Sequence, residues 1–235
     1  MPPEPRGPDT VRVRWPQAFR VIASRFPPVQ LFERLSDNPA AWEALAALDD
    51  ATNPRLRDAA GDISLVPPAR RVSGPGASFV MAPFTHVNPR GSRFSDGSYG
   101  VYYAARELET AIRETAHHFA RFARESRDPP RQEDMRVLLG KIAHAFDDLD
   151  SFPQRAKILD PDSYAASRPF GAKRRAAGSD GIAYPSVRHA GGRCIAAFWP
   201  DAVGIPVQER HLRYAWDGTQ VTRYFDFRRE AWFAL

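Results

Sequence analysis

A loop, a strand and a helix follow one another between residues 88 and 120, and this order constrains the fold more than any other part of the chain. Glycines and serines flank Arg93 in the loop, and such residues allow a backbone to approach a ligand closely. The aromatic run ending at Tyr103 predicts the strand. Apolar residues then recur at the spacing of one helix face, namely Leu108, Ala111, Ile112, Thr115, Phe119 and Phe122. The segment predicts a mixed α+β fold in which the loop and the strand lead into a core-facing helix.

Glu114 is the carboxylate of interest on this helix. At about 100° per residue it lies about 60° outside the apolar face, next to Glu107 and His118. Such a flank can line a cleft, although Glu114 could equally be a solvated residue paired with His118 four positions later. Arg93 favours the cleft, because an arginine in a glycine-serine loop can clamp a pyrophosphate through two parallel hydrogen bonds. The glycines around it match neither a P-loop nor the GxGxxG fingerprint.

Composition narrows the class of protein. No apolar run approaches the roughly 20 residues that span a bilayer, and residues 1–10 lack the features of a secretory signal. The single cysteine, Cys194, excludes an internal disulfide and favours a cytoplasmic protein. The net charge of +5 comes from 33 Lys and Arg against 28 Asp and Glu and fits an anionic ligand, a nucleic acid or a codon bias towards arginine. The chain lacks a basic face with interleaved aromatic residues, so direct nucleic-acid binding is not expected.

Local patterns along the rest of the chain predict a mixed, mainly antiparallel sheet flanked by helices. Strands are expected at Val11–Trp15, Gln17–Ala23, Ser78–Ala82, Met135–Ala145, Gly181–Ser186, Cys194–Trp199, Arg213–Ala215 and Thr219–Phe227. We expect a helical region at about 32–63, a helix opening at Asp160–Ala166 and a loop at Pro169–Asp180. Residues 1–10 should form a disordered tail and residues 11–235 a single domain.

Four separated pieces of the sequence together resemble the RES domain family. They are Arg20 in FRV, Arg93 in GSRFSDG, the run YYAARELETAIRE with Tyr103, Thr110, Ala111 and Glu114, and YPSVRHAGGRCIAAFWP with Ser186. In the second piece a serine stands where the family usually joins glycine directly to arginine. The matches extend over most of the chain, and the two middle pieces agree in both order and spacing.

The resemblance implies NAD+ chemistry on a fold similar to that of ADP-ribosyltransferases. RES proteins are the toxins of bacterial toxin–antitoxin pairs, and they cleave NAD+ at the nicotinamide–ribosyl bond or transfer ADP-ribose. By that resemblance Glu114 would stabilise positive charge on the ribose, and Tyr103 would stack on nicotinamide. Arg20 and Arg93 would hold phosphates or an incoming inorganic phosphate, and Ser186 would bind ribose or the carboxamide.

Histidines raise two further questions. His86, just upstream of the loop, could reach the same cleft, or it could be an exposed residue of no special role. His117 and His118 are neighbours on a helix and point about 100° apart, so they cannot share a metal ion. We therefore expect no metal and no cofactor, with NAD+ as the substrate.

Several alternatives stay open. The acceptor could be water, inorganic phosphate as co-substrate, or a protein, which correspond to glycohydrolase, phosphorylase and ADP-ribosyltransferase activities. The chain could instead be a non-catalytic nucleotide-binding module, or an RNase, although RNase chemistry would want a His/Lys/Glu cluster on a basic track. The toxin interpretation implies a cognate antitoxin, Xre-like in this family, and a homo-oligomer or a toxin–antitoxin hetero-oligomer.

Overall fold

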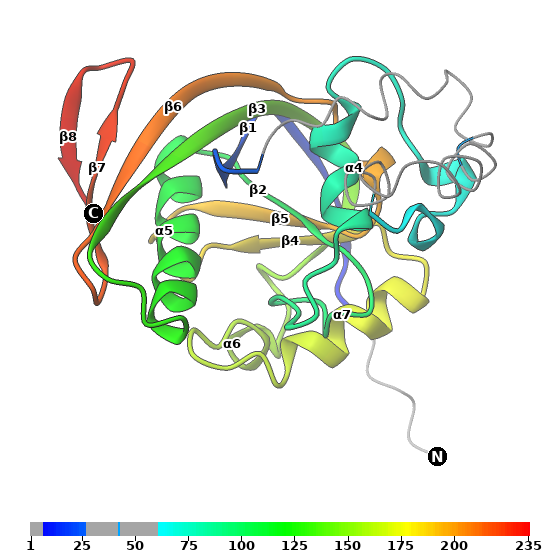
Figure 1. Cartoon of the computed structure of the whole chain (residues 1–235). Coiled ribbons are helices and arrows are strands. Elements are labelled where there is room, and N and C mark those ends of the chain that lie inside the picture. Colours follow the sequence, from blue (N-terminus) through cyan, green and yellow to red (C-terminus); the bar gives the residue numbers. More distant parts are fainter. Residues whose placement is uncertain (1–6, 27–41, 43–60) are drawn as a thin grey trace.

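One eight-stranded, mainly antiparallel sheet organises the protein, with helices on both of its faces (Figure 1). The computed structural model describes residues 7–26, Trp42 and residues 61–235. The strands are β1 (Thr10–Ala23), β2 (Tyr102–Ala105), β3 (Arg131–Asp148), β4 (Gly181–Pro185), β5 (Arg193–Ala197), β6 (Val207–Trp216), β7 (Val221–Asp226) and β8 (Ala231–Ala234). The helices are α4 (Ala77–Thr85), α5 (Leu108–Glu125), α6 (Arg155–Ile158) and α7 (Ser167–Ala176), with short 3-10 turns η2 (Ile63–Leu65), η3 (Pro68–Arg70) and η4 (Pro200–Ala202). The predicted mixed fold with mainly antiparallel strands is confirmed.

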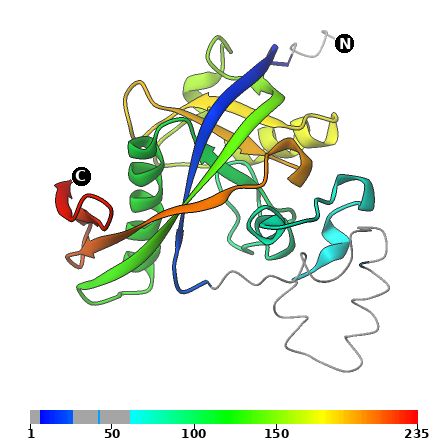
Figure 2. The same ribbon diagram turned by 90° about the horizontal axis from the view of Figure 1, so that it is seen from above.

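The strand order is β1-β2-β5-β4-β3-β6-β7-β8, and β1 also pairs with β3, so the first five strands of this order form a closed ring. Among the strands of the described residues, β3 and β4 are the one parallel pair. The long strands β1 and β3 lie side by side across the molecule, and the β7–β8 hairpin lies at the end next to α5 (Figure 2). The ring brings β1 against β2 at the pair Phe19 and Ala105, which places Arg20 beside Tyr103.

β1 is one continuous strand, although two strands separated near Pro16 were predicted. Its register against β3 shifts between Trp15 and Ala18, because Pro16 has no N–H to donate and the ladder continues through a bulge there. The shift exchanges the faces of the strand. Trp15 and Ala18 therefore face one core, and Val21 faces the other.

The alternation of side chains along β4 and β5 separates these two cores. In β5, Cys194 and Ala196 face the core beneath α5, whereas Ile195 and Ala197 face the core that contains α4. Cys194 is a buried strand residue, as predicted. Because small residues dominate β5, helices can pack closely on both of its faces.

α5 lies where the sequence predicts a helix, but its buried face is rotated. The buried residues are Thr110, Ala111, Ile112, Ala116, Phe119, Ala120 and Ala123. Phe122, predicted to face the core, is 45% exposed, and the Arg25 guanidinium lies over its ring. The reason is that the helix packs on the sheet through its alanines, which let it approach closely.

The segment 77–85 is a helix, which corrects the strand predicted at Ser78–Ala82. Ala77, Val80, Met81 and Phe84 are buried at the i, i+3, i+4 and i+7 spacing of one helix face. The short apolar run allowed either interpretation, since a buried strand and a buried helix share that signal.

Residues 160–176 also differ from the prediction. The side chain of Asp160 accepts the N–H groups of Asp162 and Ser163, which forms a turn rather than a helix. α7 begins only at Ser167 and replaces the first part of the predicted loop, as far as Ala176. Pro169 is tolerated because it lies in the first turn, where the N–H groups have no partner inside the helix.

Other boundaries shift by smaller amounts. β3 and β6 extend beyond the predicted strands, and β8 was not predicted. Of the tail predicted for residues 1–10, residues 7–10 belong to the fold, since Asp9 accepts the N–H of Asp148, while residues 1–6 lie outside the described part. Most of the predicted helical region at 32–63 also lies outside the described residues.

Gly171 sets the distance between α7 and the loop that carries Arg93. A Cβ at this position would collide with the carbonyl group of Phe94. We expect Gly171→Ala to lower the free energy of unfolding, because overpacking costs about 1–3 kcal/mol and exceeds the gain of about 1 kcal/mol in helix propensity. Denaturant unfolding measures this, with Ala176→Gly at an exposed position of the same helix as the control. A more stable Gly171→Ala protein would contradict the packing described.

Candidate functional site

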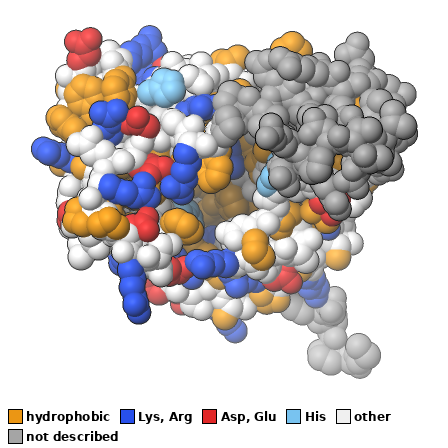
Figure 3. All heavy atoms as spheres, in the orientation of Figure 1, with side chains coloured by type: hydrophobic (Ala, Val, Ile, Leu, Met, Phe, Trp, Pro, Cys, Tyr) orange, Lys and Arg blue, Asp and Glu red, His pale blue; other side chains and the backbone are white. Residues whose placement is uncertain are grey.

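β1, β2, α5 and the β4–β5 pair enclose a cavity of about 220 Å³. It is lined by Phe19, Arg20, Val21, Tyr103, Ala104, Ala105, Ala111, Glu114, Thr115, His118, Tyr184 and Cys194. Three of the predicted site residues therefore line the same cavity, namely Arg20, Tyr103 and Glu114. The face of the molecule beside α5 is hollowed near its centre, and basic side chains border the hollow (Figure 3).

Arg20 contributes positive charge to the cavity. Its Nη1 donates to the carbonyl oxygen of Tyr103 at 3.0 Å, and its guanidinium carbon lies 4.6 Å from the centre of the Tyr102 ring. Burial lowers the pKa of Arg20, although the Tyr102 and Tyr103 hydroxyls oppose this. Within the described residues no carboxylate pairs with it. The site therefore holds a cation that an anionic ligand can neutralise.

Tyr103 joins the strand β2 to the Arg93 loop. Its hydroxyl lies 2.8 Å from Ser92 Oγ and accepts the backbone N–H of Phe94 at 3.1 Å. Burial raises the pKa of Tyr103 to about 12, so the phenol stays neutral at pH 7. Its ring forms part of the cavity wall, while its hydroxyl holds the loop in place.

Ser186 holds Glu114 in one orientation. The Ser186 hydroxyl donates to Glu114 Oε1 at 2.6 Å and accepts the backbone N–H groups of Arg188 and His189 at 3.1 and 3.0 Å. His189 Nδ1 in turn lies 2.8 Å from Thr110 Oγ1, near the start of α5. The structure places the Ser186 hydroxyl against Glu114, and Ser186 is not among the residues that line the cavity. The role in substrate binding expected for Ser186 stays a prediction.

Arg93 and His86 lie outside the cavity wall. Arg93 is only 4% exposed, its Nη1 donates to the carbonyl of Asp160 at 2.8 Å, and its guanidinium carbon lies 4.7 Å from the centre of the Tyr164 ring. It borders the site through its neighbours Ser92 and Phe94, which contact Tyr103. His86 is exposed at the end of α4, with Nδ1 3.1 Å from Thr85 Oγ1.

His118 lines the cavity and was not predicted as a site residue, although its i+4 spacing from Glu114 was a usable signal. His118 is exposed as a residue, yet desolvation by the chain packed around it, followed by His117 and Arg93, lowers its pKa to about 4. Burial and then Arg188 and Arg124 lower the pKa of His117 to about 4 as well. Both imidazoles are therefore neutral at pH 7, in a region of positive potential.

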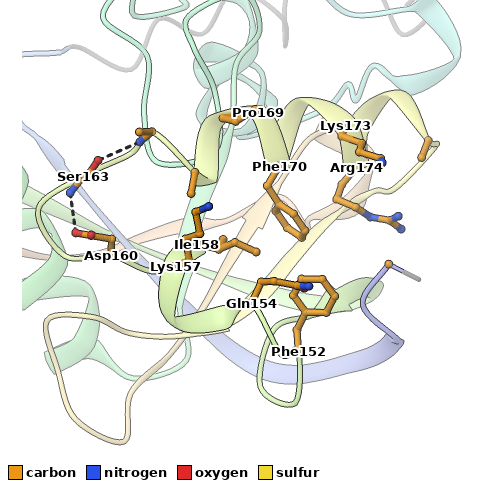
Figure 4. A pocket seen from close by; sticks show the side chains of 14 residues that line it. Phe152, Gln154, Lys157, Ile158, Asp160, Ser163, Pro169, Phe170, Lys173 and Arg174 are labelled. Carbon is orange, nitrogen blue, oxygen red and sulfur yellow. Dashed lines mark hydrogen bonds between the residues drawn. The ribbon is translucent and has the colours of Figure 1, made fainter. Parts of the chain in front are cut away.

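A larger hollow lies elsewhere, between α6 and α7, with a volume of about 890 Å³ (Figure 4). Phe152 and Phe170 lie next to each other in its wall, with ring centres 5.7 Å apart, and Lys157 and Lys173 also line it. None of the predicted site residues lines this hollow. Its size alone does not make it the site, because Arg20, Tyr103 and Glu114 lie together in the smaller cavity.

Within residues 7–26, 42 and 61–235, no cluster of three or more His, Cys, Asp or Glu side chains could hold a metal ion. No helix in this part of the chain is long and apolar enough to cross a membrane.

The two histidines predict how stability depends on pH. Unfolding would return their pKa from about 4 to the ordinary value of 6.5, so the unfolded chain binds more protons in that interval. Stability should therefore fall as the pH drops from about 6.5 to about 4. Denaturant unfolding at several pH values should show a smaller loss in the variant that combines His117→Gln with His118→Gln. An equal loss in both proteins would show that other groups cause it.

Comparison with known proteins identifies the family. The model of the RES domain matches residues 68–217, a range that contains Arg93, Tyr103, Glu114 and Ser186 but not Arg20. An uncharacterized protein, y4oC, of Sinorhizobium fredii (strain NBRC 101917 / NGR234) is 31% identical over 211 residues, which cover 89% of this chain and 86% of that protein.

A solved structure is similar at a lower level. A chain in the crystal structure of the M. tuberculosis MbcT–MbcA toxin–antitoxin complex is 11% identical, with a TM-score of 0.44 over 86% of this chain and 85% of that chain. The family match and the relative confirm the resemblance seen in the four sequence pieces, and the chain belongs to the RES domain family.

Proposed function

We propose that this protein is a bacterial toxin that consumes NAD+ by cleaving the bond between nicotinamide and ribose. The observation that carries the proposal is Glu114, a carboxylate fixed by Ser186 on the wall of a small cavity that also holds the Arg20 cation. An ADP-ribosyltransferase-like cleft and action in the cytoplasm, where NAD+ is available, are parts of the same proposal. NAD+ is the substrate, and no further cofactor is needed.

The size of the cavity supports binding of one end of the dinucleotide. Its volume of about 220 Å³ is below the roughly 300–1,000 Å³ of pockets that enclose a drug-sized ligand. Tyr103 offers an aromatic face, and Ala104, Ala105 and Ala111 offer a smooth apolar surface. The nicotinamide riboside end would enter, and the phosphates and adenosine would stay outside.

Glu114 would act on the charge that develops during cleavage. When the C1′–N bond breaks, its electron pair moves to the pyridinium nitrogen, so nicotinamide leaves as a neutral molecule without a proton donor. The ribose gains oxocarbenium character, which a nearby carboxylate stabilises. The hydrogen bond from Ser186 already fixes the carboxylate, so no reorganisation is required as the charge appears.

Arg20 could determine which molecule accepts the ADP-ribosyl group. A guanidinium without a carboxylate partner among the described residues attracts a phosphate oxygen, either of the substrate or of free inorganic phosphate. Attack of phosphate on C1′ would give phosphorolysis, and attack of water would give hydrolysis. Transfer to a protein nucleophile, or binding of a nucleotide without catalysis, are the alternatives to either outcome.

Purified protein incubated with NAD+ should release nicotinamide. Glu114→Gln should reduce the rate by about 10²-fold or more, since it keeps the shape of the side chain and removes the charge. Glu109→Gln, on the exposed side of the same helix, is the matched control and should keep the wild-type rate.

The same assay with and without inorganic phosphate separates the acceptors. A phosphate requirement indicates phosphorolysis, release without phosphate indicates hydrolysis, and ADP-ribose found on protein by mass spectrometry indicates a transferase. Full activity in a folded Glu114→Gln protein would refute the role of Glu114. Binding of NAD+ without any release would favour the non-catalytic module.

A partner follows from the proposed activity, because an enzyme that empties the NAD+ pool would kill its host. We propose a cognate antitoxin, Xre-like, that covers the cavity opening. The basic character of the chain favours an acidic segment at that contact.

Expression of the chain alone should arrest growth and deplete NAD+, and Glu114→Gln should relieve the arrest. Co-expression of an adjacent gene that encodes the antitoxin should also relieve it. The measurement is the NAD+ content of cells during induction. Normal growth with abundant folded wild-type protein and an undiminished NAD+ pool would exclude the toxin function.

A further inference from the structure

A second hollow, of about 300 Å³, lies on the other flank of α5. It is lined by Arg113, Ala116, His117, Ala120, Arg124, Arg188, Gln220, Val221 and Leu235. We call it the basic hollow, because three arginines and a histidine line it and no carboxylate side chain does.

The basic hollow and the cavity of Glu114 share two elements. α5 presents Glu114 and His118 to the cavity, and it presents His117 and Arg124 to the basic hollow. The centres of the His117 and His118 rings are 5.5 Å apart. The turn after β4 likewise contributes Ser186 to Glu114 and, two residues later, Arg188 to the basic hollow. The two spaces are therefore neighbours on either side of one helix.

Two of the three arginines are held by carbonyl groups rather than carboxylates. Arg124 donates to the carbonyl of Thr219 at 3.1 Å, and Arg188 donates to the carbonyl of Pro161. The Nε of Arg188 is buried and has no hydrogen-bond partner in the described part of the chain. Arg113 alone of the three pairs with a carboxylate, that of Glu109 at 2.8 Å. A carbonyl dipole cannot cancel a full charge, so no side chain that lines the hollow neutralises Arg124 or Arg188.

The same arginines affect the pKa of His117. After burial, the causes that lower its pKa are Arg188, Arg124, Arg121 and Arg93, all of them cations. The lowered pKa of His117 thus agrees with the position of the arginines around the hollow. The neutral imidazole can still donate one N–H to a bound oxygen.

We propose that the basic hollow is a phosphate-binding subsite in which Arg188 and Arg124 are the principal ligands. The choice of NAD+ or inorganic phosphate as the source of the bound phosphate group rests on the proposed function. NAD+ carries a pyrophosphate next to the nicotinamide riboside that the cavity would hold, and free inorganic phosphate offers the same chemistry. Arginine suits both, because its planar guanidinium binds phosphate oxygens in pairs.

Calorimetry with the full chain tests the subsite directly, with ADP-ribose and inorganic phosphate as separate probes. ADP-ribose contains the pyrophosphate and lacks the bond that the enzyme would cleave. Arg188→Ala and Arg124→Ala should each weaken ADP-ribose binding at least tenfold and reduce its dependence on salt. Arg12→Ala, an exposed residue of β1, is the charge-matched control and should stay within twofold of wild type.

The structural tie from Arg188 to Pro161 makes a second variant necessary. Arg124 is exposed, so its alanine variant should fold normally. Arg188→Lys keeps the charge and should recover part of the affinity, whereas a purely structural role would leave the salt dependence unchanged. Binding of both probes at wild-type strength in every variant would overturn the proposal, as would no binding of either probe by wild type.

The remaining outcomes identify the source and separate this proposal from the enzymatic one. Displacement of ADP-ribose by millimolar phosphate, with both lost in Arg188→Ala, assigns the subsite to phosphate in general. ADP-ribose binding that phosphate does not displace assigns it to the dinucleotide. If wild type binds ADP-ribose through Arg188 but does not cleave NAD+, the subsite stands and the proposed function fails. If Arg188→Ala and Arg124→Ala cleave NAD+ with unchanged KM and bind ADP-ribose as wild type does, the subsite fails and the function stands.

Discussion

The close contact between α5 and the turn that follows β4 fixes the geometry of the whole site. Ser186 and Glu114 meet there, and the contact is tied a second time by His189 and Thr110. Gly192, on the far side of the same turn, makes the approach feasible, since a Cβ at this position would lie 2.5 Å from Thr110 Oγ1. The glycine that looks like an ordinary turn residue is therefore needed for packing. Without that approach the carboxylate would keep its rotamer freedom, and the cavity would lose one wall.

The loops around the site are held together by arginines that bind backbone carbonyls. Arg93 donates to Asp160, Arg168 to the carbonyls of Ser92 and Arg90, and Arg188 to Pro161. Arg93 thus joins the loop before β2 to the loop before α7, Arg168 joins the loop before β2 to α7 itself, and Arg188 joins the turn after β4 to the loop before α7. This differs from the sheet surface, where Arg213 and Asp134 form an ordinary exposed ion pair. Ties to carbonyls leave the positive charge uncancelled, so the same contacts that order the loops also prepare the region for an anion.

The sequence predicts the residues of the site better than their roles. Arg20, Tyr103 and Glu114 meet at one cavity, as the four matching pieces imply. The contact of Ser186 with Glu114 could not be predicted, because the direction of the Ser186 hydroxyl depends on the backbone N–H groups of the turn, which no side-chain pattern encodes. The position of Arg20 depends on the bulge in β1, since the register shift near Pro16 decides which core each later residue faces.

Errors in secondary structure have a similar physical origin. Residues 77–85 and 167–176 are short, and over such lengths an apolar run or a proline and a glycine fit more than one structure. In both helices the outcome depends on a distant partner. α4 is held by the core on one face of β5, and α7 by the contact of Gly171 with Phe94. Tertiary packing of this kind overrides local propensity and cannot be read from a single segment.

α5 deviates from an ideal amphipathic helix at the point where the cavity lies. Spacing alone assigns Thr115 and Phe122 to the buried face, yet Thr115 lines the cavity and Phe122 is exposed. Alanines replace larger apolar residues along the face that does pack, which moves the helix towards the sheet and leaves a space beside Glu114 rather than a filled core. A helix selected only for stability would fill that space with a larger apolar side chain. α5 has small and polar residues at this place, namely Ala111, Glu114 and Thr115, which leave room for a ligand on a rigid helix. The helix therefore buries less apolar area than it could.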